Sequence, residues 1–176
     1  MRYTCCMAKT YTGTGDDGTT SHPRSGRVDK CDEAIELGGL FDEAQVAIGY
    51  ALSLCNDPLF EEFAPALSRS MDLLFEYAIA APGADTIADE VSWIEGETDH
   101  LHEKLPPLTT FVRPTGCELA CRLHLARVAV RRLERGLFRV VNTSMTSCAS
   151  SAPFINRLSD YLFVAARRAN ELAQEG

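Results

Sequence analysis

The length and composition of this chain are those of a single globular domain. It has 176 residues, of which 45% are hydrophobic and 24% are charged, and its net charge is −8. This composition excludes a disordered or fibrous protein, and the acidic balance disfavours general nucleic-acid binding. The apolar stretches fall short of the roughly 20 residues that span a bilayer, and the N-terminus lacks the apolar segment of a signal peptide. We therefore expect a cytoplasmic protein that binds neither membranes nor nucleic acid.

The charges are unevenly distributed along the chain. Residues 57–103 contain twelve acidic residues and one basic residue, Arg69, whereas residues 118–140 contain six arginines and two glutamates. Fourteen of the seventeen basic residues are arginine, the side chain suited to bidentate hydrogen bonding with oxyanions. An acidic protein that gathers its arginines on one segment is expected to bind a particular anion there.

The N-terminal segment differs from the rest of the chain. Residues 1–30 are rich in Gly, Thr, Asp and Ser and lack apolar periodicity, so we expect a loop with a short extended piece at residues 9–12. From about residue 33 onwards the apolar residues recur with the period of a helix. We predict one domain over residues 1–176, with a loop region at 1–30, whose candidate role is taken up below, and a helical bundle at 31–176.

Proline, glycine and capping residues divide the helical region into five amphipathic segments. Asp57-Pro58 predicts the start of the second helix, and a capping box from Thr86 to Asp89 predicts the start of the third. Pro106-Pro107 ends the third helix, and a small polar linker at 142–152 precedes the fifth. The fold class is therefore all-α, a five-helix antiparallel bundle with an N-terminal loop.

A glycine-rich loop is the first candidate site. Gly13-Thr14-Gly15-Asp16-Asp17-Gly18 matches the G-x-G-x-x-G pattern, but the strand–turn–helix context of a dinucleotide fold is missing. The backbone N–H groups and neighbouring hydroxyls could bind phosphate oxygens. Composition alone also fits a flexible tail.

The arginine-rich fourth helix is the second candidate site. Arg127, Arg131, Glu134 and Arg135 share one face beside the apolar stripe. Like charges one turn apart are easier to explain if an anion neutralises them, although a solvated basic face has the same pattern. Glu134 could pair with an arginine or hold a hard cation beside the anion.

Other residues left more than one interpretation open. Phe111 lies in a proline-bounded loop and could fill the core or contact a ligand, and Asp42 interrupts an apolar region of the first helix. Cys117, Cys121 and His124 share a helix face and could bind zinc or pack in the core. The odd count of seven cysteines favours reduced thiols.

Six segments in order carry a likeness to a known family. They are Tyr11-Thr-Gly-Thr-Gly-Asp-Asp-Gly-Thr-Thr20, Gly26-Arg27-Val28-x-Lys30, Asp42-Glu43 followed by Ile48-Gly49, Leu105-Pro-Pro-Leu-Thr-x-Phe111, His124-x-x-Arg127-x-x-x-Arg131-Arg132-x-Glu134-Arg135, and Asn156-Arg157-Leu158-Ser159-Asp160. Over nearly its whole length, the chain resembles ATP:corrinoid adenosyltransferases of the small helical-bundle type. The resemblance implies transfer of the 5′-deoxyadenosyl group of ATP to the cobalt of reduced cob(I)alamin, which gives adenosylcobalamin and triphosphate.

The resemblance also implies an assembly and a set of site residues. It implies a homotrimer with an active site at each subunit interface, Mg²⁺ between the phosphates, and as further partners a corrinoid reductase and an adenosylcobalamin-dependent enzyme. The residues implied to bind the phosphates are Thr12, Gly13, Thr14, Gly15, Thr20, Ser21 and Lys30. Those implied to hold the rest of the nucleotide are Arg131, Arg132, Glu134, Arg135 and Asn156, with Glu134 near the metal. Phe111 would lie against the lower face of the corrin, and Asp42 would pair with Arg127 across the interface.

Three departures from the family pattern stand out. Gly13 and Asp17 occupy positions where many members have a basic residue, Leu40-Phe41 replaces a pair of small or polar residues, and Thr115-Gly116-Cys117 replaces a double-glycine turn. The altered charge of the loop favours an alternative function, a non-catalytic bundle that binds nucleotide or corrinoid as a carrier or sensor.

Overall fold

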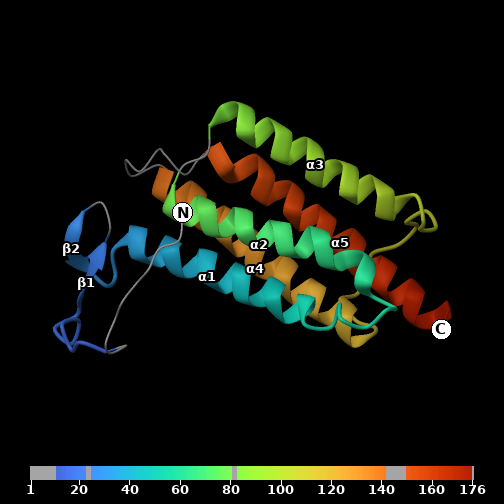
Figure 1. The fold of residues 1–176 in the computed structure, drawn as a ribbon, viewed down its shortest axis with the longest axis horizontal. Helices are drawn as coiled ribbons and strands as arrows, with labels where there is room; N and C mark the ends of the chain where they lie inside the picture. Colours follow the sequence, from blue (N-terminus) through green and yellow to red (C-terminus); the bar gives the residue numbers. More distant parts are fainter. Residues whose placement is uncertain (1–10, 23–24, 81–82, 142–149, 176) are drawn as a thin grey trace.

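The computed structural model describes residues 11–22, 25–80, 83–141 and 150–175. Within these ranges five long helices lie side by side, and a small antiparallel hairpin projects beyond the N-terminal end of the first (Figure 1). The elements are β1 (Thr19–His22), β2 (Gly26–Asp29), α1 (Glu33–Leu52), the 3-10 helix η1 (Glu61–Phe63), α2 (Ala64–Ile79), α3 (Ala84–His102), α4 (Glu118–Val141) and α5 (Ala152–Glu175). The predicted all-α five-helix bundle is confirmed.

The bundle is held together by a continuous apolar core. α4 packs against both α1 and α5, α3 covers α5, and α2 covers α1. The stripes of the five helices meet in this core, whose largest fully buried side chains include Phe41, Phe63, Leu67, Tyr77, Phe154 and Tyr161. Described residues form no helix of the length and apolarity needed to cross a membrane.

The contact between α1 and α4 explains one departure from the family pattern. Leu40 and Phe41 are both buried, and the Leu40 side chain fills the space beside Gly136 of α4. A Cβ atom at position 136 would overlap Leu40. The larger residue on α1 is therefore accommodated by the missing side chain on α4.

The prediction of a loop over residues 1–30, with an extended piece only at 9–12, is wrong where the structure describes these residues. β1 and β2 pair antiparallel, with Thr20 opposite Val28 and Ser21 opposite Arg27. Each strand has four residues, too few for an alternating pattern to stand out in a polar sequence. Most of the extended piece predicted at residues 9–12 lies outside the described residues, and its last two residues are not in a strand.

Two predicted helix starts are also wrong. The Asp57 carboxylate accepts the N–H of Leu59 at 2.9 Å and stabilises a turn, and α2 begins only at Ala64. α3 begins directly after Gly83, which makes no side-chain cap, so Thr86 lies inside its first turn. Of the predicted linker, residues 142–149 lie outside the described residues.

Candidate active site

The glycine-rich loop before β1 is held in shape by Arg27. The Arg27 guanidinium donates to the Thr14 carbonyl and the Thr19 hydroxyl and lies 3.3 Å from Asp17 Oδ1. Asp17 also accepts the hydroxyl and the N–H of Thr19 at 2.7 and 2.9 Å. These bonds and the Arg27 charge hold the pKa of the Asp17 carboxyl below its usual value. The negative charge at position 17 is thus engaged within the loop itself.

Lys30 lies across the same loop. Its N–H donates to the Gly18 carbonyl at 2.9 Å, and a Cβ atom at position 15 would lie 3.3 Å from its Cε and Nζ atoms. Gly13 and Gly18 have φ angles of 70° and 86°, a backbone conformation that glycine adopts without strain. Glycine at position 15 therefore lets the Lys30 ammonium approach the loop backbone closely.

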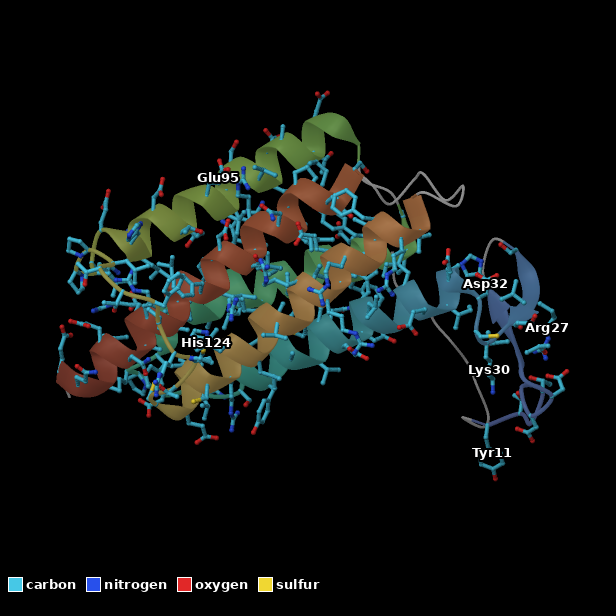
Figure 2. The ribbon with its side chains drawn as sticks, turned by 180° about the vertical axis from the view of Figure 1, so that it is seen from behind. Tyr11, Arg27, Lys30, Asp32, Glu95 and His124 are labelled. Carbon is cyan, nitrogen blue, oxygen red and sulfur yellow. The ribbon has the colours of Figure 1, made fainter. Side chains whose placement is uncertain are left out.

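The loop and hairpin contain all the residues predicted to bind phosphate: Thr12, Gly13, Thr14, Gly15, Thr20, Ser21 and Lys30. The hydroxyls of Thr12 and Thr14 lie 2.8 Å apart, and both residues are exposed. Figure 2 shows Tyr11, Arg27 and Lys30 at the end of the molecule beyond α1, standing away from the helices. The structure therefore places the residues predicted to bind phosphate together, on a part of the chain that projects from the bundle.

The arginines of α4 face in different directions. Arg132 turns toward α1, where its guanidinium lies 2.8 Å from Glu43 Oε2 and 3.6 Å from Glu36 Oε1. Arg131 is exposed, and no described carboxylate lies within ion-pair distance of its guanidinium. Arg135 donates to the Arg131 carbonyl at 3.0 Å. The structure thus separates Arg132 from the other nucleotide residues predicted on this helix.

A hydrogen-bonded chain joins α4 to α5 and α3. Asn156 Nδ2 donates to Glu134 Oε1 at 2.8 Å, and Asn156 Oδ1 accepts from Arg157 at 2.7 Å. Arg157 is in turn paired with Glu95 at 2.6 Å. Glu134 lies three residues after Arg131 and so on the same side of the helix. The structure therefore brings Glu134 and Asn156 into contact and places Arg131 on the same side of α4 as Glu134.

The described residues contain no group of three or more His, Cys, Asp or Glu side chains that could hold a metal ion. Mg²⁺ usually keeps several waters and binds through one or two carboxylates together with substrate phosphates. Glu134 is a single half-buried carboxylate with Oε1 engaged by Asn156. This arrangement fits a magnesium ion that arrives with a polyphosphate and does not fit a metal held by the protein alone.

Phe111 does not fill the core. Its side chain is fully exposed on the connection between α3 and α4, beside an open cavity of about 450 Å³. The cavity is lined by Leu108, Thr110, Phe111, His124, Arg127 and Phe163, among others. An exposed aromatic ring at the rim of an apolar cavity is suited to contact a large ligand.

Two polar side chains in this cavity wall have buried nitrogen atoms for which the described part of the chain offers no hydrogen-bond partner. His124 is 4% exposed, and neither of its ring nitrogens has a hydrogen-bond partner. Burial, with a smaller effect of the Arg127 charge, lowers the pKa of His124 below 6.5. The Arg127 Nε atom is also buried without a partner. Figure 2 shows His124 within the helical body, far from the hairpin.

The zinc alternative is not supported. The Cys117 thiol donates to the Ala169 carbonyl at 3.4 Å, and the Cys121 thiol lies 3.8 Å from the Gly116 carbonyl. Together with buried His124 they form no metal-binding group in the described part of the chain. The Cys117 thiol instead bonds to a backbone carbonyl of α5, and the Cys121 thiol bonds to the Gly116 carbonyl just before α4.

Asp42 and Arg127 do not pair within the chain. Asp42 is exposed on α1, and Arg127 lies in the wall of the Phe111 cavity on α4. Among the described residues no ion pair joins them. A contact between them therefore needs a second copy of the chain.

The comparisons with known proteins identify the family. The family model described as cobalamin adenosyltransferase matches residues 10–169. This chain belongs to the cobalamin adenosyltransferase family. The human corrinoid adenosyltransferase MMAB is 36% identical over 179 residues, which cover 93% of this chain and 69% of the human protein. A corrinoid adenosyltransferase of Bacillus subtilis is 35% identical over 169 residues, covering 92% of this chain and 86% of that protein.

A solved structure agrees with the same family. It is a variant of a PduO-type ATP:corrinoid adenosyltransferase from Lactobacillus reuteri, with histidine in place of a phenylalanine, complexed with cobalamin and ATP. Its TM-score is 0.85 with 31% sequence identity, over 94% of this adenosyltransferase and 93% of that chain. The family model and the solved structure therefore agree over nearly the whole length of this chain.

The sequence analysis of this adenosyltransferase missed one residue that holds the glycine-rich loop in shape. Arg27 holds the glycine-rich loop, yet it was not among the predicted site residues, although it lies inside the Gly26-Arg27-Val28 segment. The signal was an arginine close to a loop that carries two aspartates, Asp16 and Asp17. Its bonding partners, 8 to 13 residues away, become visible only when the hairpin is formed.

Proposed function

We propose that this adenosyltransferase moves the 5′-deoxyadenosyl group of ATP to the cobalt of reduced cob(I)alamin. The Co(I) electron pair forms the new cobalt–carbon bond as the bond between C5′ and the phosphate oxygen breaks, and triphosphate leaves with the electron pair of that broken carbon–oxygen bond. Because cobalt is itself the nucleophile, the protein needs no activated serine or cysteine. It has to orient C5′ toward cobalt and stabilise the charge of the leaving triphosphate.

The single observation that carries this proposal is the arrangement on the face shared by α4 and α5. Arg131 and Glu134 lie along the same side of α4 as Arg127, which lines the cavity beside Phe111, and Asn156 of α5 donates to Glu134. An anion site next to an apolar cavity is what a reaction between a nucleotide and a corrinoid requires. Family membership agrees with this assignment.

For the nucleotide, we assign the phosphates to the glycine-rich loop and Lys30, and the rest of ATP to α4 and α5. Backbone N–H groups, hydroxyls and the Lys30 ammonium supply donors at the loop. On the helices the residues are Arg131, Arg132, Glu134, Arg135 and Asn156. The exposed ion pairs of Arg132 with Glu43 and Glu36 are weak enough to be exchanged for a phosphate. Mg²⁺ would neutralise charge on the phosphates, with Glu134 as its protein ligand.

For the corrinoid, we assign Phe111 to the lower face of the ring. Its exposed side chain can exclude an axial ligand from cobalt, and Arg127 lies in the same cavity wall. Without that ligand a Co(II) corrinoid is easier to reduce. A reductase that delivers the electron and an enzyme that uses adenosylcobalamin are the partners that this chemistry calls for.

The outer face of α1 and α4 supports assembly into a homotrimer. It exposes four large apolar side chains: Val46 (72%), Tyr50 (49%), Leu125 (54%) and Val128 (54%). Val46 and Tyr50 are one turn apart on α1, as are Leu125 and Val128 on α4, and exposed apolar side chains grouped in this way are typical of a protein–protein contact. Asp42 lies one turn before Val46 on α1, and Arg127 directly precedes Val128 on α4, so a head-to-tail contact through this face can bring Asp42 of one copy to Arg127 of the next. Head-to-tail contacts close into a ring when the rotation between successive copies closes on itself.

An anaerobic assay tests the proposed function. Protein, ATP, Mg²⁺ and cob(I)alamin should give the absorption spectrum of an alkylcobalt product, with one triphosphate released per adenosylcobalamin. A carrier or sensor would bind ATP and corrinoid without releasing triphosphate. That second result, with binding confirmed by titration, would replace the proposed enzyme with the non-catalytic alternative.

A further inference from the structure

We propose that Arg167 and Asn170 of α5 are positioning residues that hold the Phe111 loop at both of its ends. The inference rests on the corrin-facing role proposed for Phe111. The Phe111 loop is the connection from Glu103 to Cys117, which runs from the end of α3 to the start of α4 past the C-terminal half of α5 (Figure 1). Nothing in the sequence motifs assigned a role to either α5 residue.

Arg167 holds the first end of the loop. Its guanidinium donates to the Pro106 carbonyl at 2.6 Å. Pro106 and Pro107 have no N–H groups, so this part of the backbone can be held by hydrogen bonds only through its carbonyl oxygens. A guanidinium is a strong donor for that purpose, because charge-assisted hydrogen bonds exceed neutral ones in strength.

Asn170 holds the second end. Its side-chain oxygen accepts the N–H of Cys117 at 2.9 Å, and its side-chain nitrogen donates to the Thr115 carbonyl at 3.0 Å. Gly116 between them has a φ of 131°, and a Cβ atom there would overlap the Asn170 side chain. This contact explains the changed turn in this chain: position 115 accepts threonine, but position 116 has to be glycine.

Between the two anchors the loop has little support of its own. In the part of the chain that the structure describes, the only backbone bond within residues 107–116 runs from Thr115 N–H to the Arg113 carbonyl at 2.8 Å. Residues 106–116 are all exposed, Phe111 among them. Arg167 and Asn170 are three residues apart and therefore lie on one side of α5. A single rigid helix thus sets both ends of the loop on which the Phe111 ring is carried.

The reaction makes the placement of this ring important. A ring that keeps an axial ligand off cobalt has to stay in place while the ligand competes for the same position. Precise placement depends on the residues that support a functional side chain. Loss of an anchor should therefore affect the reaction that starts from Co(II) more than the reaction that starts from preformed Co(I).

The variants are Arg167→Met and Asn170→Leu, with Phe111→Ala as the reference for a lost ring. Arg168→Met is the matched control, because the neighbouring Arg168 pairs with Glu62 at 3.1 Å and Glu175 at 3.8 Å and makes no described bond to the loop. Arg167→Lys keeps a charged donor for the Pro106 carbonyl. Each protein is assayed for product formation from Co(II) with a reductant and from Co(I), and for ATP affinity by titration.

We expect Arg167→Met and Asn170→Leu each to lower the ratio of the Co(II) rate to the Co(I) rate at least fivefold, as Phe111→Ala should also do. Their ATP affinity should stay within twofold of that of the unmodified protein. Arg167→Lys should restore most of the ratio, and Arg168→Met should leave it unchanged. In electron paramagnetic resonance of bound Co(II)cobalamin with ATP, the splitting from the axial nitrogen should persist in the anchor variants. Hydrogen exchange of residues 106–117 should be faster in them than in Arg168→Met.

An unchanged rate ratio and unchanged exchange in the anchor variants would overturn the inference. A loss of both rates equal to that of Arg168→Met would also overturn it, because it would show a general loss of stability. The proposed function fails separately, if the unmodified protein forms no adenosylcobalamin. The exchange measurement does not depend on that activity, so it tests the two anchors in either case.

Discussion

Two adjacent arginines of α4 have very different surroundings. Arg132 is paired with carboxylates of α1, whereas the Arg131 guanidinium has no described carboxylate partner and lies on the side of Glu134 and Asn156. A free arginine beside an ordered carboxylate and amide is ready to bind an anion. The distinction depends on which side of the helix each residue occupies, and two adjacent arginines in the sequence do not reveal it.

Arg131→Ala should weaken ATP binding or slow transfer at least tenfold. Charge-assisted hydrogen bonds to a phosphate are worth roughly 1.5–3 kcal/mol each, and about 1.4 kcal/mol corresponds to a factor of ten. Calorimetric titration with Mg²⁺ and ATP measures the affinity. Arg139→Ala, two turns further along α4, is the control. Unchanged affinity together with unchanged turnover in Arg131→Ala would remove Arg131 from the site.

Buried His124 predicts how stability depends on pH. Its pKa is lower in the folded protein than the ordinary 6.5, so the unfolded chain binds more protons just below that pH. Stability is then complete above about pH 6.5 and decreases as the pH falls below it. In His124→Leu, the urea concentration at the denaturation midpoint should change less between about pH 6.5 and pH 5 than it does in the unmodified protein. A pH profile identical to that of the unmodified protein in this window would contradict the buried neutral imidazole.

Glu62 provides an internal reference in the same experiment. Burial alone raises the pKa of Glu62, but its hydrogen bonds and charge interactions with Lys104 and Arg168 outweigh burial and bring the pKa below 4.5. This carboxylate stabilises the folded protein above pH 4.5 and loses its effect as the pH falls further. The decrease below pH 4.5 should therefore persist in His124→Leu.

At the scale of the elements, the hairpin and the helices differ in how they are stabilised. Each helix contributes a long apolar stripe to one core, whereas the hairpin and its loop are held by polar contacts around Arg27. The conformation of the loop thus depends on a few exposed hydrogen bonds. An exposed polar network of this kind contributes little to global stability but can order a binding loop.

Arg27→Ala should therefore weaken ATP binding several-fold with little change in melting temperature. The loop loses its links to Thr14, Asp17 and Thr19, and Asp17 keeps its charge without the neighbouring guanidinium. Ser25→Ala, in the turn of the same hairpin, is the control. If Arg27→Ala bound ATP as tightly as Ser25→Ala, the loop would not need this arginine to be in a binding conformation.

The sequence was most informative where a pattern is long. Periodicity over about 20 residues defined all five helices, because each stripe has to reach the core, and α4 and α5 were placed almost to the residue. Helix starts depend on local capping, and the competing turn at Asp57 was not recognisable. The strands of the hairpin were too short to detect. In the site, the resemblance supplied the residues, but the pairing of Arg132 with Glu43 joins positions 89 residues apart and needs the folded chain.

At the scale of the whole molecule, the two halves of the proposed site do not meet within one chain. The glycine-rich loop projects beyond α1, and no described bond joins it to Arg131, Glu134 or Asn156 (Figure 2). The apolar outer face of α1 and α4 offers a surface through which a second copy can approach. A ring of copies would place the loop of one against α4 of the next.

The pairing proposed for Asp42 and Arg127 belongs to the proposed assembly. In a buried contact, removal of one partner leaves an uncompensated charge that costs about 3–5 kcal/mol. Asp42→Asn and Arg127→Ala should each weaken trimer stability or corrinoid binding, and the double variant should be clearly less damaged than the sum of the two. Sedimentation and corrinoid titration measure both effects. Additive losses would show that the two residues do not touch.

The measurement that tests the central claim most directly is complementation between two inactive variants. Lys30→Ala damages the loop half of the site and leaves α4 intact, and Arg131→Ala does the reverse. After the two are unfolded, mixed in equal amounts and refolded together, about a quarter of the sites in randomly mixed rings should contain both intact halves. We predict that the mixture forms adenosylcobalamin from ATP and cob(I)alamin at about that fraction of the wild-type rate. A mixture no more active than its separately refolded parents would contradict a site shared between copies.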